Sequence, residues 1–454
     1  MAGARTSGSN GRWGRRAALL LATLVGVASS GGPGLALEGR GRGHHRDSLE
    51  RAAGRLDRDL ARDALRTLSR GQAIFRYDSF GNEDFWGGAL RLHEAVATVD
   101  PVTALAVGLK VDVEALPRSL VKALKRGEVD LTDPQVTVAL LKLDAVVGVK
   151  GVFDAGGQFE SMGIQCALCH STVDDSFAPG IGRRLDGWAN RDLNVGAIVA
   201  LAPDLSPFAD LLGVSEATVR QVLNSWGPGK FDASLSFDGK AFRDDGQPGA
   251  VLIPPAFGLA GVNLHTWTGW GSVSHWNALV AVLEMHGKGT FVDARLNDAA
   301  RFPIAAAAGF ADVRTDDDRV TGKLGALHLY QLALEAPPPP RGSYDRHAAK
   351  AGEELFSGKA GCGTCHVPPL YTEPGHNLHS PEEIGIDAFQ AERSPARGYR
   401  TSPLKGLWTH AKGGFYHDGR FETLADVVDH YDAFQALGLT PAEKRQLVEF
   451  LKSI

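Results

Sequence analysis

One five-residue pattern, C-x-x-C-H, occurs twice in this chain and constrains it more than any other feature. It stands at residues 166–170 (CALCH) and at residues 362–366 (CGTCH), and these two motifs hold all four cysteines of the chain. Two thiols at this spacing, followed at once by an imidazole, are the attachment signature of c-type haem. The thiols bond to one edge of the porphyrin, and the histidine ligates the iron. The sequence therefore predicts two covalently bound haem c groups, attached at Cys166, Cys169, Cys362 and Cys365, with His170 and His366 as iron ligands.

Two other uses of paired cysteines compete with haem attachment. A redox-active C-x-x-C pair is typical of a βαβ context, and the sequence around the two motifs does not have that pattern. A structural zinc site recruits four ligands from two neighbouring knuckles, whereas these two pairs lie far apart in the chain. Haem attachment is the reading that also uses both histidines.

The first 37 residues have the pattern of a secretory signal. Four arginines (Arg5, Arg12, Arg15 and Arg16) precede an apolar run over residues 17–28, and small residues follow it. The run is short for a membrane span, and an N-terminal anchor is the alternative. Because haem can be attached after translocation, we expect a periplasmic protein. No other apolar run is long enough to span a bilayer, so we expect no stable membrane span in the mature chain.

The charge of the chain limits its partners. Its 454 residues carry a formal net charge of −5. Mild acidity argues against a nucleic-acid partner and suits a basic patch on a redox partner. We expect the electron donor to be a small redox protein or a quinol-linked protein.

The periodicity of apolar residues predicts an all-α fold with two cytochrome c-like haem domains in tandem. A helical N-terminal domain over 47–150 comes first, opened by a capping pattern at Asp47. The first haem domain follows over 151–336, and four prolines within 336–343 mark a linker. The second haem domain spans 344–454. We expect its first helix, which leads into the second motif, to pack on a last helix that begins near Thr440, as in cytochrome c.

The sixth iron ligands are predicted from a weak internal repeat. The segment 279–286 resembles 424–431, which makes His286 and Tyr431 equivalent, and we predict both as iron ligands. The chain has three methionines, and none follows the second motif, so a His/Met pair is not expected there. Alternatives stay open at both haems. They are Met285, His265 and His275 for the first haem, and His430, His417 and His410 for the second.

Two further groups of charged residues have candidate roles. Arginines downstream of the first motif are candidates for haem propionates, because a guanidinium pairs with a carboxylate through two hydrogen bonds. They are Arg183, Arg184 and Arg191. Scattered acids in a glycine-rich loop offer a calcium site, although they match no EF-hand pattern. They are Asp232, Asp238, Asp244 and Asp245.

The C-terminal motifs resemble those of the bacterial di-haem cytochrome c peroxidase and MauG family. The resemblance rests on residues 401–407 (TSPLKGL) and 414–424 (GFYHDGRFETL) and covers about the last quarter of the chain. It implies that Tyr431 ligates the second haem, as in the tyrosine-ligated branch of that family. It also implies that the first haem binds H2O2. The first half of the chain departs from the family pattern, since it lacks a clear FWDGR block.

These observations favour a peroxidase-type oxidoreductase in which one haem passes electrons to the other. Trp267, Trp270 and Trp276 are candidates for the bridge between the haems. A pure electron-transfer carrier is one alternative. A redox-sensing or docking subunit without catalysis, in which residues 47–150 bind a partner, is another.

Overall fold

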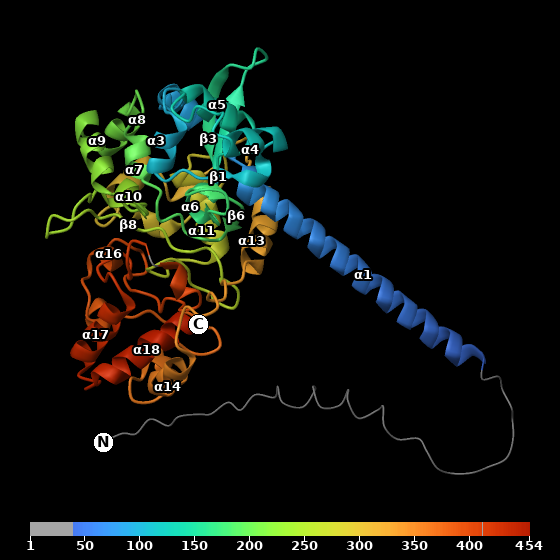
Figure 1. The fold of residues 1–454 in the computed structure, drawn as a ribbon, viewed down its shortest axis with the longest axis vertical. Coiled ribbons are helices and arrows are strands. Elements are labelled where there is room, and N and C mark those ends of the chain that lie inside the picture. Colours follow the sequence, from blue (N-terminus) through green and yellow to red (C-terminus); the bar gives the residue numbers. More distant parts are fainter. Residues whose placement is uncertain (1–39, 411) are drawn as a thin grey trace, which may run out of the picture. The chain divides into compact units, whose positions relative to one another are not determined.

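The computed structural model describes residues 40–410 and 412–454 (Figure 1). The predicted signal over residues 1–37 therefore lies outside the described residues. The chain divides into two compact units, Met1–Arg62 and Asp63–Ile454. Every site below belongs to the second unit.

Helices are the main element of the described chain. The first helix begins at Arg40, before the start predicted at Asp47. The α-helices are α1 (Arg40–Tyr77), α2 (Leu92–Val96), α3 (Pro101–Ala106), α4 (Arg118–Lys125), α5 (Pro134–Lys142), α6 (Ala167–His170), α7 (Val195–Val199), α8 (Ser206–Leu212), α9 (Glu216–Ser225), α10 (Leu235–Asp238), α11 (Val273–Leu279), α12 (Pro303–Ala308), α13 (Leu324–Ala333), α14 (Arg346–Ser357), α15 (Pro381–Ile384), α16 (Phe389–Glu392), α17 (Leu424–Gln435) and α18 (Pro441–Ser453).

Short helical turns of other kinds separate these helices. Two are π-helical, η1 (Asp84–Ala89) and η3 (Val280–Glu284). The 3-10 turns are η2 (Val113–Ala115), η4 (Ala294–Asn297), η5 (Thr321–Lys323), η6 (Cys362–Thr364) and η7 (Leu407–His410).

Five two-stranded sheets accompany the helices in the described part of the chain. The pairing of β1 with β5 is parallel, and the other four pairings are antiparallel. The helix-rich part of the all-α prediction is confirmed, whereas these strands were not expected. The strands are β1 (Val111–Asp112), β2 (Val149–Phe153), β3 (Phe159–Ile164), β4 (Ser171–Val173), β5 (Ile181–Gly182), β6 (Arg184–Asp186), β7 (Lys230–Phe231), β8 (Val251–Leu252), β9 (Phe291–Val292) and β10 (Asp312–Val313).

Two apolar clusters surround the first motif. One joins Trp86 and Leu140 to Leu168 and Ile253. The other joins Phe75 to Ala167 and to residues of α11, η3 and α13. Segments before and after residue 150 thus share one core, and the predicted boundary at that residue stays a prediction.

The first and last helices of the C-terminal region, α14 and α18, cross closely, and Figure 1 shows them side by side. Gly352 of α14 makes the approach possible, since a Cβ there would lie 2.0 Å from the carbonyl oxygen of Gln446. The rings of Phe356 and Phe450 pack beside it, with centroids 5.0 Å apart. The start of α18 is as predicted, with Thr440 capping the helix and proline at its first position. This crossing fixes the helix that leads into the second motif.

None of the helices in the described part of the chain is both long enough and apolar enough to cross a membrane.

Candidate haem sites

The first C-x-x-C-H motif is a short helix held between two strands. β3 leads into α6, and β4 begins directly after His170. The Nδ1 atom of His170 lies 3.1 Å from the carbonyl oxygen of Pro254, so Nδ1–H donates to that oxygen. Burial lowers the pKa of His170 to about 4, so the ring is neutral at pH 7. A neutral imidazole whose Nδ1 is fixed in this way presents Nε2 as a metal ligand.

The second motif repeats this arrangement in a different local structure. Gly361 adopts a left-handed φ of 66° and starts the 3-10 turn η6. The Nδ1–H of His366 donates to the carbonyl oxygen of Tyr371 over 3.2 Å. Burial lowers the pKa of His366 to about 4. Both motif histidines are therefore neutral and oriented by a backbone carbonyl.

The four motif cysteines are free thiols in the structure. Burial raises the pKa of Cys166 and of Cys169 to about 12, and that of Cys362 to about 11. A thiol in apolar surroundings has a raised pKa, so these values report the burial of the two motifs. Protonated thiols beside a neutral imidazole fit the attachment of haem.

A cavity of about 300 Å³ lies beside the second motif. Cys362, Cys365 and His366 line it together with Tyr431 of α17. The rest of its wall is mainly apolar, as a porphyrin requires. The residues present therefore fit a haem at this position. Apolar lining residues include Phe356, Ile384, Leu404, Leu407, Leu424, Val428, Leu447 and Leu451.

Tyr431 is held in the cavity by a well-capped helix. Thr423 and Asp426 form a reciprocal capping box at the start of α17. Burial raises the pKa of the Tyr431 hydroxyl, and the two nearby motif thiols act in the same direction. The ring of Tyr416 lies with its centroid 6.4 Å away, and its buried hydroxyl has no hydrogen-bond partner among the described residues. Two phenols are thus available at one cavity.

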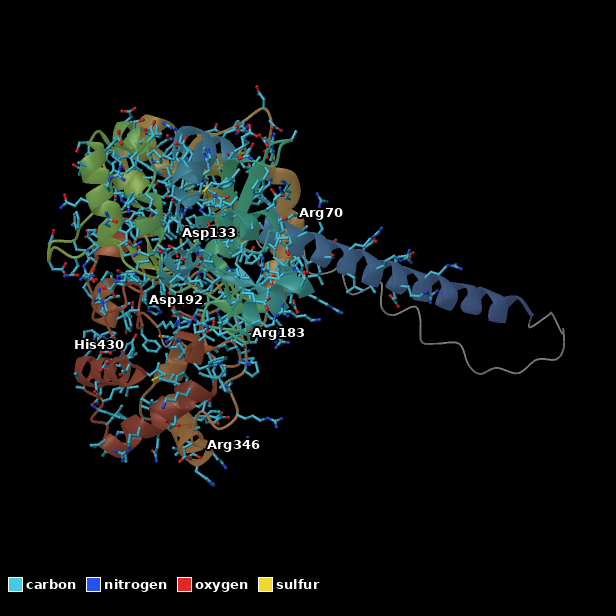
Figure 2. The ribbon with its side chains drawn as sticks, turned by 45° about the horizontal axis from the view of Figure 1, so that its top comes forward. Arg70, Asp133, Arg183, Asp192, Arg346 and His430 are labelled. Carbon is cyan, nitrogen blue, oxygen red and sulfur yellow. The ribbon has the colours of Figure 1, made fainter. Side chains whose placement is uncertain are left out.

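The alternative ligands of the second haem lie in different surroundings. The Nε2 atom of His430, labelled in Figure 2, lies 3.1 Å from the carbonyl oxygen of Ile384. The ring of His417 stacks on Tyr399, with centroids 5.1 Å apart. His410 lines the cavity, and its buried Nε2 has no partner among the described residues.

A second histidine of the C-terminal region is tied into a charged cluster at the cavity wall. His379 is 6% exposed, with Nε2 2.7 Å from Glu373 and Nδ1 2.9 Å from Glu383. Thr401 also lies against its Nε2, at 3.0 Å. Burial opposes the charged ring, but the two carboxylates outweigh it and raise the pKa of His379. A histidine held between two carboxylates therefore stands at the cavity wall, and the cluster has no excess of positive charge.

His286 and Tyr431, which the internal repeat makes equivalent, have different local conformations in the structure. Tyr431 lies within a regular helix, whereas His286 comes after the π-helical η3 with a left-handed φ of 57°. Its ring stacks on Phe85, with centroids 3.5 Å apart, and the rings of Trp86 and Phe208 lie close by. The structure thus surrounds His286 with aromatic rings, and its role as an iron ligand stays a prediction.

The other candidates for the first haem are also buried. Met285 is 4% exposed. Burial lowers the pKa of His265 to about 4, and its Nδ1 has no partner in the described chain. The Nε2 of His275 is likewise unpaired there and lies 3.9 Å from Asp293. Buried polar atoms without partners are rare in folded proteins, so this segment fits a bound polar group.

Glu284 is a candidate site residue that the sequence analysis missed. Its carboxyl is buried, with Oε1 unpaired among the described residues, and burial raises its pKa well above the ordinary value. The adjacent residues Leu283 and Met285 share an apolar cluster with Ala167 of the first motif. Glu284 ends the π-helical turn η3, and such turns recur at functional sites. No sequence signal separates it from an ordinary surface glutamate.

Of the three tryptophans expected to bridge the haems, Trp267 lines the second cavity. Its Nε1–H donates to the carbonyl oxygen of Leu252 over 2.8 Å, which fixes the ring. The Nε1–H of Trp270 instead donates to a carboxylate oxygen of Asp293. The ring of Trp276 packs edge-on against the ring of Trp270.

Three of the four acids expected to offer a calcium site pair with arginines, and for Asp244 the calcium site stays a prediction. Asp232 and Asp238 both pair with the buried guanidinium of Arg393, at 3.0 and 2.8 Å. Asp245 pairs with Arg243 at 2.7 Å. One guanidinium therefore already compensates the two most buried carboxylates.

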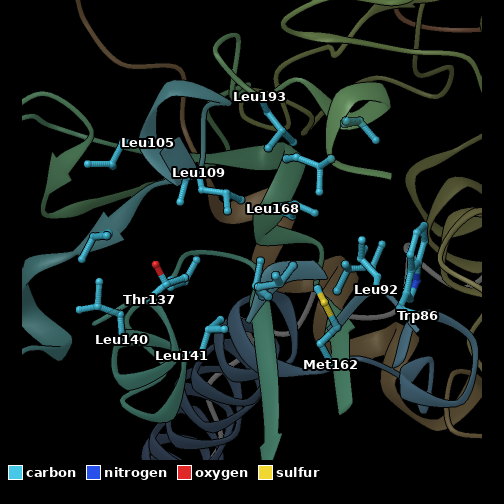
Figure 3. A pocket seen from close by; sticks show the side chains of 18 of the residues that line it. Trp86, Leu92, Leu105, Leu109, Thr137, Leu140, Leu141, Met162, Leu168 and Leu193 are labelled. Carbon is cyan, nitrogen blue, oxygen red and sulfur yellow. The ribbon is translucent and has the colours of Figure 1, made fainter. Parts of the chain in front are cut away.

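A smaller cavity of about 60 Å³ lies beside the first motif (Figure 3). Leu168 of the motif, Met162 and Trp86 line it with residues of α3 and α5. Its lining is apolar apart from the unpaired hydroxyl of Thr137. It is too small to hold a cofactor and reflects imperfect packing beneath the motif.

Comparison with known proteins places the chain beside haem enzymes. No protein-family model matches it. The methylamine utilization protein MauG of Methylorubrum extorquens is 28% identical over 155 residues, which cover 30% of this chain and 43% of that protein. The cytochrome-c peroxidases IdrP1 and IdrP2 of Denitromonas iodatirespirans are 26% and 27% identical, covering 34% and 23% of this chain and 55% and 39% of their own lengths. The chain is thus similar to MauG and to cytochrome c peroxidases, as its C-terminal motifs indicated, and its matches span about half or less of these relatives.

Two solved structures overlap the chain loosely. One is hydrazine synthase of Kuenenia stuttgartiensis, with 17% identity and a TM-score of 0.29, covering 47% of this chain and 76% of that one. The other is a MauG-like protein associated with microbial copper homeostasis, with 17% identity and a TM-score of 0.30, covering 49% and 79%. Overlaps this loose do not define the fold of the chain.

Proposed function

We propose that this chain is an exported di-haem c-type cytochrome that reduces H2O2 with electrons from a redox partner. The observation that carries the proposal is the asymmetry between two otherwise matching motifs. Both have a neutral histidine fixed by a carbonyl oxygen, but only the second shares its cavity with an iron-ligating side chain of the tyrosine type. The similarity to MauG and to cytochrome c peroxidases supports the same assignment.

In this proposal the haems are covalent and lie in two cytochrome c-like domains, 151–336 and 344–454, behind a helical domain over 47–150. Bound haem supplies an iron that exchanges electrons and, where a coordination position is open, binds peroxide. His170 and His366 would hold the irons through Nε2. Tyr431 would be the further protein ligand at the second site, which would then serve to store and pass electrons.

Protons for the reaction come from the side of the first motif. Reduction of H2O2 breaks the O–O bond, takes up two electrons and two protons, and yields two waters. Glu284 is suited to deliver a proton, because burial raises the pKa of its carboxyl and its Oε1 is unpaired in the described chain. A raised pKa favours the protonated form that a general acid needs.

Trp267 would lie on the route of electrons between the two haem sites. A small redox protein or a quinol-linked donor docks from outside, and Trp267 is fixed at the cavity wall by its bond to Leu252. Residues 1–37 direct export, which places the reaction in the periplasm.

A second candidate function is electron transfer or redox sensing without catalysis. The packing of Met285 and His286 near the first motif favours it, since either side chain would close the first iron to peroxide.

Carbon monoxide binding to the fully reduced protein distinguishes the two functions. CO binds ferrous haem with an open or easily displaced sixth position, and binding shifts the Soret band. We expect a shift on about half of the haem, followed by peroxide turnover that Glu284→Gln reduces and Glu422→Gln, at an exposed site, leaves unchanged. The absence of any CO-induced shift would mean two closed haems and would refute the peroxidase assignment.

A further inference from the structure

Arg191 is a buried cation without a partner. Its side chain is 7% exposed, and none of its three guanidinium nitrogens has a hydrogen-bond partner among the described residues. Burial alone lowers its pKa to about 10, and no carboxylate acts on it in the opposite direction. Folded proteins pair buried charges, so a guanidinium in this state indicates an anion that binds it.

The carboxylate next to Arg191 in the chain is already paired, and the nearby Lys230 adds a second positive charge, not a counterion. Asp192, labelled in Figure 2, binds Lys110 and Lys412, each at 2.7 Å. The two other arginines expected to hold propionates are also paired: Arg183 with Asp174 at 3.0 Å, and Arg184 with Asp112 at 3.2 Å. Of the three arginines, Arg191 is the one whose guanidinium has no partner at any of its nitrogens among the described residues.

The position of Arg191 connects the two motifs. The neighbouring backbone N–H of Asn190 donates to the carbonyl oxygen of Cys169 over 2.9 Å, so the residue lies directly beside the first motif. Its guanidinium extends toward the C-terminal region, where a Cβ on Gly413 would lie 3.5 Å from Nη1. The positive charge of Arg191 also acts on His410, which lines the second cavity, and contributes to the lowered pKa of that histidine.

We propose that Arg191 is the counterion of a haem propionate at the boundary between the two haem sites. The proposal rests on the proposed function, because it requires covalent haem. A propionate is an anionic carboxylate at the edge of the ring, and a guanidinium binds it through two parallel hydrogen bonds. Arg191, which follows the first motif in the chain, would thereby bind a carboxylate of the cofactor at the boundary with the second site. Arg191 is then a positioning residue that also sets a reduction potential.

The experiment uses the full-length holoprotein with three substitutions. Arg191→Gln removes the charge, Arg191→Lys keeps the charge without the two-pronged geometry, and Arg183→Gln removes an exposed, paired arginine as the matched control. Covalent haem is counted by the pyridine haemochrome assay, and the midpoint potential of each haem is measured by spectroelectrochemical titration. Resonance Raman spectra report the propionate bending band.

We expect Arg191→Gln to lower the midpoint potential of one haem, because loss of a nearby positive charge favours the ferric state. The haem that shifts identifies the propionate. Arg191→Lys should keep the potential close to that of the unmodified protein while moving the propionate band, and Arg183→Gln should change neither. Unchanged potentials in Arg191→Gln, at full haem content, would overturn the inference. If Arg191→Gln does not fold, an unchanged propionate band in Arg191→Lys overturns it. Absence of covalent haem from the unmodified protein would instead refute the proposed function.

Discussion

Substitution of Gly352 by alanine tests the helix crossing that supports the second site. The added Cβ would lie 2.0 Å from the carbonyl oxygen of Gln446 and 2.8 Å from the Cβ of Phe450. Backbone atoms cannot rotate away, so α14 and α18 must separate, at a cost near the upper end of overpacking, about 3 kcal/mol. Alanine also returns about 1 kcal/mol of helix propensity. We therefore expect a net loss of about 2 kcal/mol in the free energy of unfolding.

The matched control is Gly325→Ala in α13. Gly325 is helical as well, but a Cβ there meets no heavy atom within 4 Å, so only the gain of about 1 kcal/mol should remain. Urea unfolding of the holoprotein, followed by circular dichroism and by Soret absorbance, gives both values. Because α14 leads into Cys362, we also expect Gly352→Ala to lower haem content at the second motif alone. If Gly352→Ala stabilises the protein as Gly325→Ala does, the close crossing of α14 and α18 is wrong.

Three further substitutions test the sites. Arg393→Met should cost about 3–5 kcal/mol of unfolding free energy, because it leaves two buried aspartates without their cation; a loss below about 1 kcal/mol in urea unfolding would contradict that role. His379 has a raised pKa in the folded state, so its contribution to stability is complete below about pH 6.5 and is lost as pH rises through the folded pKa. The stability difference between the unmodified protein and His379→Gln should therefore shrink from pH 6 to pH 9, and a difference independent of pH would count against the charged cluster. Tyr431→Phe should change the absorption spectrum of the second haem alone, and an identical spectrum would remove Tyr431 as its ligand.

The sequence was most informative where the chemistry is local. Five consecutive residues define each motif, and capping residues predicted where α18 begins, since both signals involve neighbours in the chain. The pairing of α14 with α18 was also predicted, from the packing of the first helix on the last helix in cytochrome c, and it is confirmed. The short strands were not predicted, since two-residue pairings such as that of β1 with β5 leave no periodic pattern in the sequence.

The sequence was least informative where partners come from distant segments. Arg393 meets Asp232 and Asp238 across more than a hundred residues of chain, so acids that suggested calcium are instead bound to a guanidinium. The pKa of Glu284 is raised only because the fold buries its carboxyl. The internal repeat also gave no sign that a π-helical turn precedes His286, whereas its counterpart Tyr431 lies within a regular helix.

The two equivalent segments that hold His286 and Tyr431 differ in helix geometry. The regular helix α17 holds Tyr431 at the cavity wall, where the proposed function makes it the ligand that closes the second iron. In the first half the π-helical turn η3 removes the equivalent histidine from that register, and Phe85 stacks on its ring. The same turn ends at Glu284, whose carboxyl is buried, and burial raises the pKa of that carboxyl. One local change in helix geometry thus gives His286 different surroundings from Tyr431 and places a buried carboxyl in the same turn, and the proposed division of roles between the two haem sites rests on this difference.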